Sequence, residues 1–488
     1  MKKENKKLNR KGSILAYALI MMMVVSIILV SMLQYISSQI KLGSYRLEKE
    51  KAFQVAEAGI YYYRWYLAHN ISGKTAAEID AFWSAGAVGV MGPADFEFVD
   101  AEGGGAIGVY RLDVIAPSAG STIITVKSTG WTYKEPDAKR TVQVRFRRPS
   151  WSEYMFLSDT FINFGDQADV YGKVHSNTGI RFDGLAHSLV TSSVASFNDP
   201  SHGGGVEFGV HTHGGAVDPN APAYPWPDGT VPDRPDVFMG GREFPVAPVN
   251  FSGLTTDLAA MKVKAQAGTG KYFNADGEGR RIIFKNNTFD ACIVDTFHHV
   301  NFSISKYLQN DGSGTCNTCT GSGTGPSGCV KNYPIVDNEV IFVENDAWVE
   351  GIVDGRRVSV VAANLLGTGD PANVYVGLSN LRYTSYSCSN IVGLIAQKDV
   401  TVVSGCPDDF VIDAAVLAQS GAVGITSNMS NKNSLTFNGA IVSYLQPFFA
   451  HSGGFAVRFY NFDNDLLYCP PPYFPTGTEY AIDQWEEL

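Results

Sequence analysis

The chain has 488 residues, of which 45% are hydrophobic, 12% aromatic and 18% charged. A chain of this length holds about two to four domains, and its composition excludes a globally disordered protein. The 50 glycines, together with many Val, Ile, Thr, Ser and Asn residues, favour short strands joined by turns. Most of the chain is therefore expected to be β.

The net charge of −10 is distributed unevenly. Residues 1–12 carry six Lys or Arg and one Glu, which leaves 32 basic against 47 acidic residues in the remainder, a balance of −15. An acidic body repels phosphate backbones, and the sequence offers no basic patch that points to nucleic acid. Nucleic acid is therefore excluded as an expected partner.

Residues 13–33 form an uncharged apolar segment. As a helix, 21 residues span about 31 Å, which matches the hydrocarbon core of a bilayer. The basic residues before the segment and the acidic body after it predict a cytoplasmic N-terminus and a body outside the membrane. A cleaved secretory signal is disfavoured because the apolar run is long and no convincing cleavage site follows it. The helical pattern continues to His69, which a simple membrane anchor does not require.

Two short motifs in this region resemble those of type IV pilins. Lys11-Gly12, directly before the apolar segment, resembles a prepilin cleavage site. Residues 52–59, AFQVAEAG, resemble the A-F-x-A-A-E-A-x signature of minor pilins with a PilX-like N-terminal domain. The resemblance covers residues 11–67, and its signature positions are Ala52, Phe53, Ala56, Glu57, Ala58 and Gly59.

The resemblance implies a processing and assembly pathway. A prepilin peptidase would cut after Gly12 on the cytoplasmic face, and Ser13 would become the new N-terminus, commonly methylated in that family. The helix would then leave the bilayer and pack with other pilin subunits in a filament core. Tyr17 stands at the fifth mature position, where the family usually has a glutamate, which implies a minor rather than a major subunit. Glu57 is expected to be a solvated helix residue, and the aromatic residues at 61–66 are expected to anchor the helix to the body.

Three segments after the helix alternate apolar and polar residues between turn residues, at 108–117, 121–131 and 139–148. They predict a three-stranded antiparallel meander packed on the end of the helix, which resembles the small sheet of pilin-like folds. Alternation puts Arg145 and Arg147 opposite Val144, which predicts a solvated basic face.

An internal repeat follows in the second half of the chain. Residues 351–361, GIVDGRRVSVV, align without gaps on residues 393–403, GLIAQKDVTVV, at an offset of 42. Coils of about 20 to 24 residues that cannot bury their own apolar faces predict a β-solenoid with a Val, Ile and Leu interior. The Pro-rich end of the chain is expected to cap an open solenoid edge.

The predicted fold is mainly β with one long N-terminal α-helix: a pilin-like helix and small antiparallel sheet, followed by the β-solenoid. The expected regions are a basic leader at 1–12, the helix at 13–69, the small-sheet region at 70–150, the solenoid at 151–465 with inserted loops at 199–333, and the cap at 466–488. The inserted loops are the expected place for a binding surface.

Seven cysteines are an odd number, so pairing leaves at least one over. Three of them lie in the Gly-rich stretch CNTCTGSGTGPSGC, which has too little apolar content to pack and would benefit from disulfides. A zinc site would need four ligands, and no second C-x-x-C is present. The candidates for disulfides are Cys292, Cys316, Cys319, Cys329, Cys388, Cys406 and Cys469.

The search for chemistry gives no expected catalytic site, cofactor or metal. His202, His211 and His213 have a spacing that suits a metal, with Glu207 nearby, but their Gly-rich surroundings favour an exposed polar loop. Residues 274–279, NADGEG, are a partial calcium loop without its later Glu. Asp408-Asp409 is an acidic pair in the repeat region without matching partners, so a glycan-active enzyme is not favoured.

The sequence therefore predicts a minor pilin-like structural component of a type IV pilus or related filament, with a solenoid displayed for assembly or surface attachment. The expected partners are a prepilin peptidase, other pilin subunits, the inner or cytoplasmic membrane before assembly, and surface ligands. The alternatives are an unprocessed single-pass surface adhesin and a surface β-helix enzyme acting on glycans.

Overall fold

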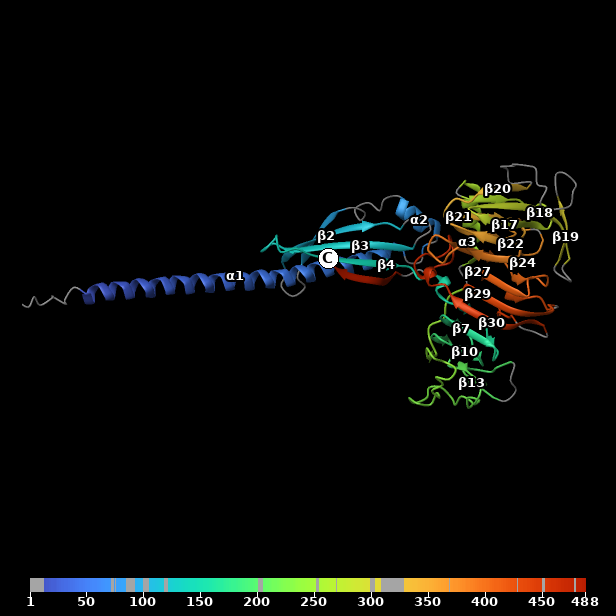
Figure 1. The fold of residues 1–488 in the computed structure, drawn as a ribbon, viewed down its shortest axis with the longest axis horizontal. Helices are drawn as coiled ribbons and strands as arrows, with labels where there is room; N and C mark the ends of the chain where they lie inside the picture. The colour runs from blue at the N-terminus through green and yellow to red at the C-terminus, as the bar shows by residue number, and fades with distance from the viewer. Residues whose placement is uncertain are drawn as a thin grey trace, which may run out of the picture.

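The computed structural model describes residues 13–71, 74, 76–84, 93–99, 105–117, 122–200, 205–251, 254–268, 270–298, 303–308, 329–367, 369–427, 429–449, 453–477 and 480–488. The fold is mainly β with one long N-terminal helix, which confirms the predicted class (Figure 1). Gly12 lies outside the described residues, as do His202, Cys316 and Cys319.

Helix α1 runs from Ser13 to Asn70, 58 residues without a break. At 1.5 Å per residue it is about 87 Å long. Its first half projects away from the rest of the molecule (Figure 1), and it contains an 18-residue window with a mean hydropathy of 2.7, none of which is buried. This helix is long and apolar enough to cross a membrane.

The second half of α1 packs on an antiparallel sheet with the order β1-β2-β3-β4-β31. The predicted meander forms β2, β3 and β4, whereas the two outer strands were not expected. The last strand comes from the C-terminal end of the chain. The bounds are β1 Ala94–Val99, β2 Ala106–Ile115, β3 Ile123–Thr132, β4 Arg140–Arg147 and β31 Ala481–Glu487, with helix α2 at Ala76–Ser84.

The basic residues of β4 are not a solvated face, because they bind β31. Arg145 forms an ion pair with Asp483, and Arg147 forms ion pairs with Asp483 and Glu153. The expectation of a solvated face is therefore wrong. The acidic composition of the last strand, AIDQWEE, supplies the complementary charges that hold it against β4.

The remaining body is built from parallel strands that stack in register, here called the parallel stack (residues 156–462). Its strands fall into three ladders. The first ladder contains β16 Gly270–Phe273, β21 Glu339–Val343, β23 Arg357–Ala362, β25 Ile391–Ala396, the second half of β27 Asp409–Ala418, the second half of β29 Asn431–Ser443, β5 Phe156–Ser158, β8 Val174–Ser176, β11 Val190–Ser192 and β15 Arg242–Glu243.

Two further ladders complete the parallel stack. The second contains β17 Gly279–Asn286, β22 Asp346–Val353, β24 Val374–Tyr383, β26 Val400–Val402 and β28 Val423–Ile425, with β6 Ile162–Phe164, β9 Ile180–Phe182 and β14 Val210–His211 forming a separate parallel sheet. The third joins the first halves of β27 and β29 to β30 Gly454–Phe462, β7 Ala168–Tyr171 and β10 Leu185–Ala186. Antiparallel additions are β18 Thr288–His298, β19 Ser303–Leu308 and β20 Val330–Pro334, and the pair β12 Ser196–Phe197 with β13 Glu207–Phe208.

The chain enters this stack in the middle. Strand β5 pairs on one side with β8, which follows it directly in the ladder, and on the other with β29, so that Phe156 is the partner of Ile441. The chain first builds outward from β5 to β15, crosses to the far end, and then builds back from β16 to β29. Several of these strands lie within 199–333, so the expectation that this region only interrupts the repeat with inserted segments is wrong.

The repeat is present in a different register from the predicted one. The offset of 42 would match Gly351 with Gly393, but the structure pairs Gly393 with Ser359, 34 residues earlier, and places Gly351 in the neighbouring ladder. Each coil carries several short apolar strands, so one face of a coil resembles another face of the next. The gapless alignment matched two different faces.

The apolar side chains of the described residues form three main cores. One fills the interior of the parallel stack, with Val, Ile, Leu and Phe from all three ladders. A second lies on the outer side of the first ladder, where helix α3 (Leu254–Gln266) and the tail residue Phe474 cover it. The third lies between α1 and the small sheet.

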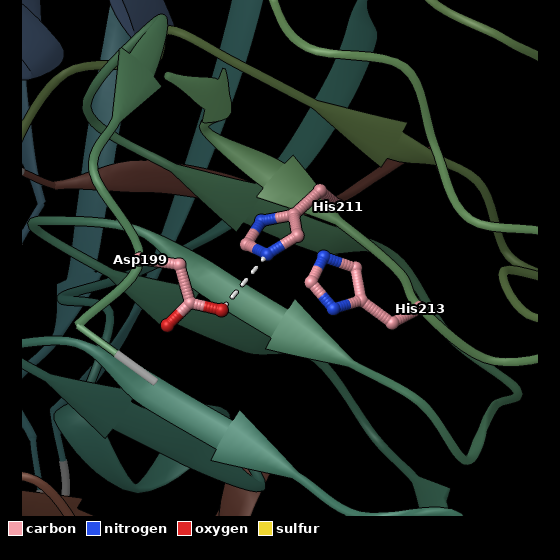
Figure 2. Close-up of side chains that lie close together, drawn as sticks. All are labelled: Asp199, His211 and His213. Carbon is pink, nitrogen blue, oxygen red and sulfur yellow. Dashed lines mark hydrogen bonds and ion pairs between the residues drawn. The ribbon is translucent and has the colours of Figure 1, made fainter. Parts of the chain in front are cut away.

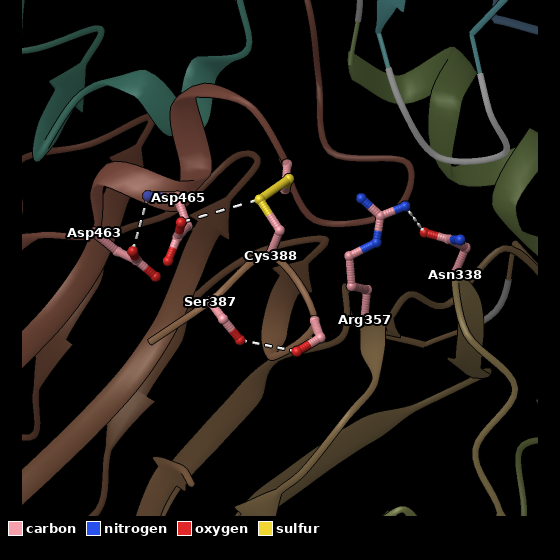
Figure 3. The surroundings of a disulfide bond; sticks show 8 residues. Asn338, Arg357, Ser387, Cys388, Asp463 and Asp465 are labelled. Carbon is pink, nitrogen blue, oxygen red and sulfur yellow. Dashed lines mark hydrogen bonds between the residues drawn. A yellow bond between two sulfur atoms is a disulfide. The ribbon is translucent and has the colours of Figure 1, made fainter. Parts of the chain in front are cut away.

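The C-terminal tail crosses a sheet face and then joins the small sheet, so the expected cap on an open edge is wrong. After the short helix η3 (Asn464–Leu467), Cys469 forms a disulfide with Cys388 (Figure 3). Ser359 Oγ then donates a hydrogen bond of 2.5 Å to the carbonyl oxygen of Pro472. The tail therefore joins the parallel stack to the small sheet.

Candidate functional site

Two groups of residues stand out as candidate sites: the junction between α1 and β3, and a cluster of Asp199, His211 and His213. The junction consists of Glu48, Ala52, Ala56 and Gly59 on α1, with Ser128, Gly130 and Thr132 on β3. Ser13 begins α1, and Tyr17 lies on its projecting half with 69% of its surface exposed.

The small residues of the helix signature allow α1 to lie directly against β3. Ala52 and Ala56 are fully buried. A Cβ atom on Gly130 would lie 2.3 Å from the carbonyl oxygen of Ala52 and 2.4 Å from the backbone nitrogen of Ala56. A Cβ atom on Gly59 would lie 2.3 Å from Ser128 Oγ. The signature therefore has a packing role here, because larger residues would force the helix off the sheet.

The other signature residues lie around this contact. The ring of Phe53 meets the ring of Trp485 on β31 edge to face, 5.9 Å between centroids, and the guanidinium of Arg140 lies 5.3 Å from the centre of the Phe53 ring. Glu57 and Ala58 are half-buried. The last strand of the chain thus contacts the signature helix as well as β4.

Of the aromatic residues expected to anchor the helix, only some are buried. Tyr63 is fully buried in the core against the small sheet, whereas Tyr61 and Trp65 are more than half exposed. Tyr62 lies against Phe96 of β1, 5.2 Å between ring centroids. One side of the helix is therefore anchored and the opposite side remains exposed.

Glu48 is a functional candidate that the sequence analysis missed. It is buried at the start of the junction, where it accepts hydrogen bonds from Thr132 Oγ1 at 2.9 Å and Lys134 Nζ at 3.2 Å, with Lys51 Nζ at 3.5 Å. Burial alone would raise the pKa of Glu48, but the hydrogen bonds from Thr132 and Lys134 outweigh it, so the pKa is lowered from 4.5. The sequence did offer one signal for Glu48. It lies on the predicted helix between the uncharged segment and the AFQVAEAG motif.

We expect Glu48→Gln to destabilise the junction by about 1–2 kcal/mol at pH 7, because the charge-assisted bonds are lost. The pKa of Glu48 is lower in the folded than in the unfolded protein. Its contribution to folding stability is therefore fully present above the unfolded pKa of 4.5, and it is lost as the pH falls through the folded pKa. Hydrogen exchange of β3, measured by mass spectrometry at several pH values, tests both expectations. The control Glu57→Gln, on the same helix, should change exchange little; equal effects of the two substitutions would contradict this role for Glu48.

The second candidate site lies where β12, β13 and β14 meet, beside β9 (Figure 2). The side chains of Asp199, His211 and His213 point toward one another, and one possible ligand atom from each lies within 4.8 Å of the others. His211 Nε2 lies 3.4 Å from Asp199 Oδ2, and His213 Nε2 lies 4.0 Å from Glu207 Oε1. His211 is fully buried in β14, so the expected exposed loop is wrong for this residue.

Burial favours the neutral form of His211. It lowers the pKa of His211 below its ordinary value of 6.5, although the carboxylates of Glu207 and Asp199 oppose the shift. The ring is therefore neutral near pH 7, which is the form that binds metals. Arg181 Nη1 lies 3.7 Å from Asp199 Oδ2. Asp199 was missed by the sequence analysis because eleven residues, four of them glycine, lie between it and His211.

The other chemical candidates have structural partners. The oxygens of the partial calcium loop bind a guanidinium, since Arg280 donates to Asp276 Oδ2 at 2.8 Å and to Asn274 Oδ1 at 3.2 Å. Asp408 pairs with Lys432 at 3.0 Å. Asp409 accepts a hydrogen bond of 2.6 Å from Ser434 Oγ, which lowers its pKa. The Asp408-Asp409 pair therefore binds side chains of the next coil.

The cysteines divide into disulfides and one free thiol among the described residues. Cys388 is bonded to Cys469, and Cys292 and Cys329 are also disulfide-bonded. Cys406 is a buried free thiol, and burial raises its pKa to about 11. Its thiolate is therefore not formed at neutral pH, so Cys406 is a core residue rather than a nucleophile.

Comparisons with known proteins give a structural similarity but no family. No protein-family model and no curated protein matches this chain. Among solved structures, the competence-associated pilin ComZ from Thermus thermophilus matches with 14% sequence identity and a TM-score of 0.31, over 90% of this chain and 98% of that chain. A TM-score of this size does not establish a shared fold.

Proposed function

We propose that this chain is the membrane-inserted precursor of a minor, pilin-like subunit of a type IV pilus or related filament. In this proposal a prepilin peptidase cuts after Gly12, and α1 then passes from the membrane into a filament core. The parallel stack is displayed outside for assembly or surface attachment. The role is structural rather than catalytic.

The observation that carries the proposal is the continuity of α1. One unbroken helix of 58 residues joins an exposed, charge-free half to a half that packs on an antiparallel sheet. A simple membrane anchor needs only about 20 helical residues. In the proposed filament, the longer helix would join the core to the head without a flexible break. The exact backbone fit of Ala52, Ala56 and Gly130 supplies that rigidity.

The position of the parallel stack supports a displayed role. Figure 1 has the projecting half of α1 and the parallel stack at opposite ends of the molecule, with the small sheet between them. The stack would therefore lie farthest from the membrane. A head of this size would clash if it were repeated at every position along a thin filament, which favours a tip or sparse position.

The decisive measurement is the intact mass of the full chain after expression with a prepilin peptidase. We expect the mature chain to begin at Ser13, with or without a methyl group, and Gly12→Val to remain uncleaved. Gly43→Ala is the matched control, because Gly43 is a helical glycine with no other atom within 4 Å of an added Cβ. It should be cleaved as the wild type is.

The alternatives give different results in the same experiment. A wild-type chain that keeps Met1 or Lys2 at its terminus would contradict the pilin proposal and favour an unprocessed single-pass surface adhesin. Cleavage of Gly12→Val at the wild-type rate would contradict the assigned site.

A further inference from the structure

We propose that Asp199, His211 and His213 bind a divalent transition-metal ion of the zinc class. The three side chains come from two adjoining segments and converge on one point, with their ligand atoms within 4.8 Å of one another (Figure 2). This site is separate from α1 and is independent of the proposed filament role.

The separation of the ligand atoms suits one shared ion. Zinc bonds of about 2.0–2.1 Å in a tetrahedral shell place neighbouring ligand atoms about 3.3 Å apart. His211 Nε2 and Asp199 Oδ2 are already 3.4 Å apart. A direct hydrogen bond prefers 2.7–3.2 Å. The ligand atom of His213 lies within 4.8 Å of the other two, and a rotation of its side chain would bring it into the shell.

The backbone around the ligands is fixed rather than loop-like. His211 lies in β14, whose residues pair in register with Ile180 and Arg181 of β9. The backbone nitrogen of His213 donates a hydrogen bond of 2.7 Å to Asp183 Oδ1. Two neighbouring histidine positions are therefore held before any ion binds, which lowers the entropy cost of binding.

The charge of the pocket favours a cation. Asp199 and Glu207 are both buried carboxylates, and positive charge nearby stabilises a buried carboxylate. Arg181 contacts Asp199, but its Nε donates to Asp183 at 2.7 Å, so its charge is shared with a further acid. A divalent ion would add positive charge beside these carboxylates; Glu207 Oε1 lies 4.0 Å from His213 Nε2 but outside the group of three ligands.

The donor set selects the class of metal. Calcium and magnesium prefer six or more oxygen ligands, whereas two imidazoles and a carboxylate suit zinc, cobalt, nickel or iron. The cysteines described near the parallel stack are disulfide-bonded or buried in the core and do not join this cluster. Cobalt is therefore a suitable spectroscopic substitute for zinc.

The test uses the full chain in detergent, stripped of metal with a chelator and titrated with Co²⁺. We expect one equivalent to bind, with visible d–d absorption and no sulfur-to-cobalt charge-transfer band, and Zn²⁺ to displace it. Asp199→Asn and His211→Gln should each weaken binding by at least about tenfold. Zn²⁺ should raise the Tm of the wild type but not that of the variants.

The matched control is His187→Gln. His187 also pairs with a carboxylate, since its Nε2 lies 2.7 Å from Asp169 Oδ1, but it is outside the cluster, so this variant should bind Co²⁺ as the wild type does. If His211→Gln fails to fold, as judged by circular dichroism, His213→Gln carries the test. The proposal is overturned if the wild type shows no saturable binding, or if the cluster variants bind as tightly as His187→Gln.

Discussion

Gly130→Ala is expected to separate α1 from the small sheet and to destabilise this part of the molecule by at least about 3 kcal/mol. The added Cβ would meet two backbone atoms of α1, at 2.3 Å from the carbonyl oxygen of Ala52 and 2.4 Å from the nitrogen of Ala56. Backbone atoms of a helix cannot turn aside as a side chain does. The whole helix must move, and the packing of Tyr63 and its neighbours is lost with it.

The consequence is measurable as faster hydrogen exchange in β3 and as new tryptic cleavage at Lys49 and Lys51. Gly105→Ala is the control, because Gly105 lies in the same region and an added Cβ there has no other atom within 4 Å. It should behave as the wild type does. Exchange in Gly130→Ala that matches this control would contradict the close approach of helix and strand.

The long helix and the meander could be predicted because both follow from local patterns. An uncharged apolar run followed by helical spacing predicts α1, and alternation predicts β2, β3 and β4. The place of β31 could not be predicted in this way. Its partner β4 lies more than 300 residues earlier, and the register depends on ion pairs such as Arg145–Asp483.

The order of coils in the parallel stack was hidden for a related reason. Each coil offers similar apolar strands to any neighbour. The sequence therefore does not show that β5 pairs with β29, through Phe156 and Ile441, as well as with β8. The same similarity between faces produced the wrong register of the repeat. Long-range pairing is decided by the whole set of contacts, which no window of sequence contains.

In the candidate sites, too, local patterns were visible in the sequence but long-range contacts were not. The spacing of His211 and His213 was visible in the sequence, but its interpretation as an exposed loop was wrong because β9 pairs with β14 and buries His211. Glu48 looked like one of several charged helix residues. Its partners, Thr132 and Lys134, come from the end of β3 and the turn that follows, and only the folded sheet brings them to the helix.

The double substitution Cys388→Ala/Cys469→Ala is expected to lower the stability of the parallel stack by about 4 kcal/mol. The bond joins residues 81 positions apart, and in the chain-entropy model a loop of this length contributes about 4–5 kcal/mol. The bond also holds the tail against the first ladder, where Phe474 is buried and Ser359 binds Pro472. Denaturant unfolding without reductant measures the loss.

Cys406→Ala is the control for removing a buried cysteine, and it should cost only about 1 kcal/mol because Cys406 is a free thiol. Hydrogen exchange then locates the effect. In the double variant we expect faster exchange in β23 and β25, which the tail covers, while β4 stays protected because Arg145 and Asp483 still hold β31. Simultaneous loss of protection in β4 would contradict this division and would mean that the disulfide, rather than the ion pairs, keeps the last strand in the small sheet.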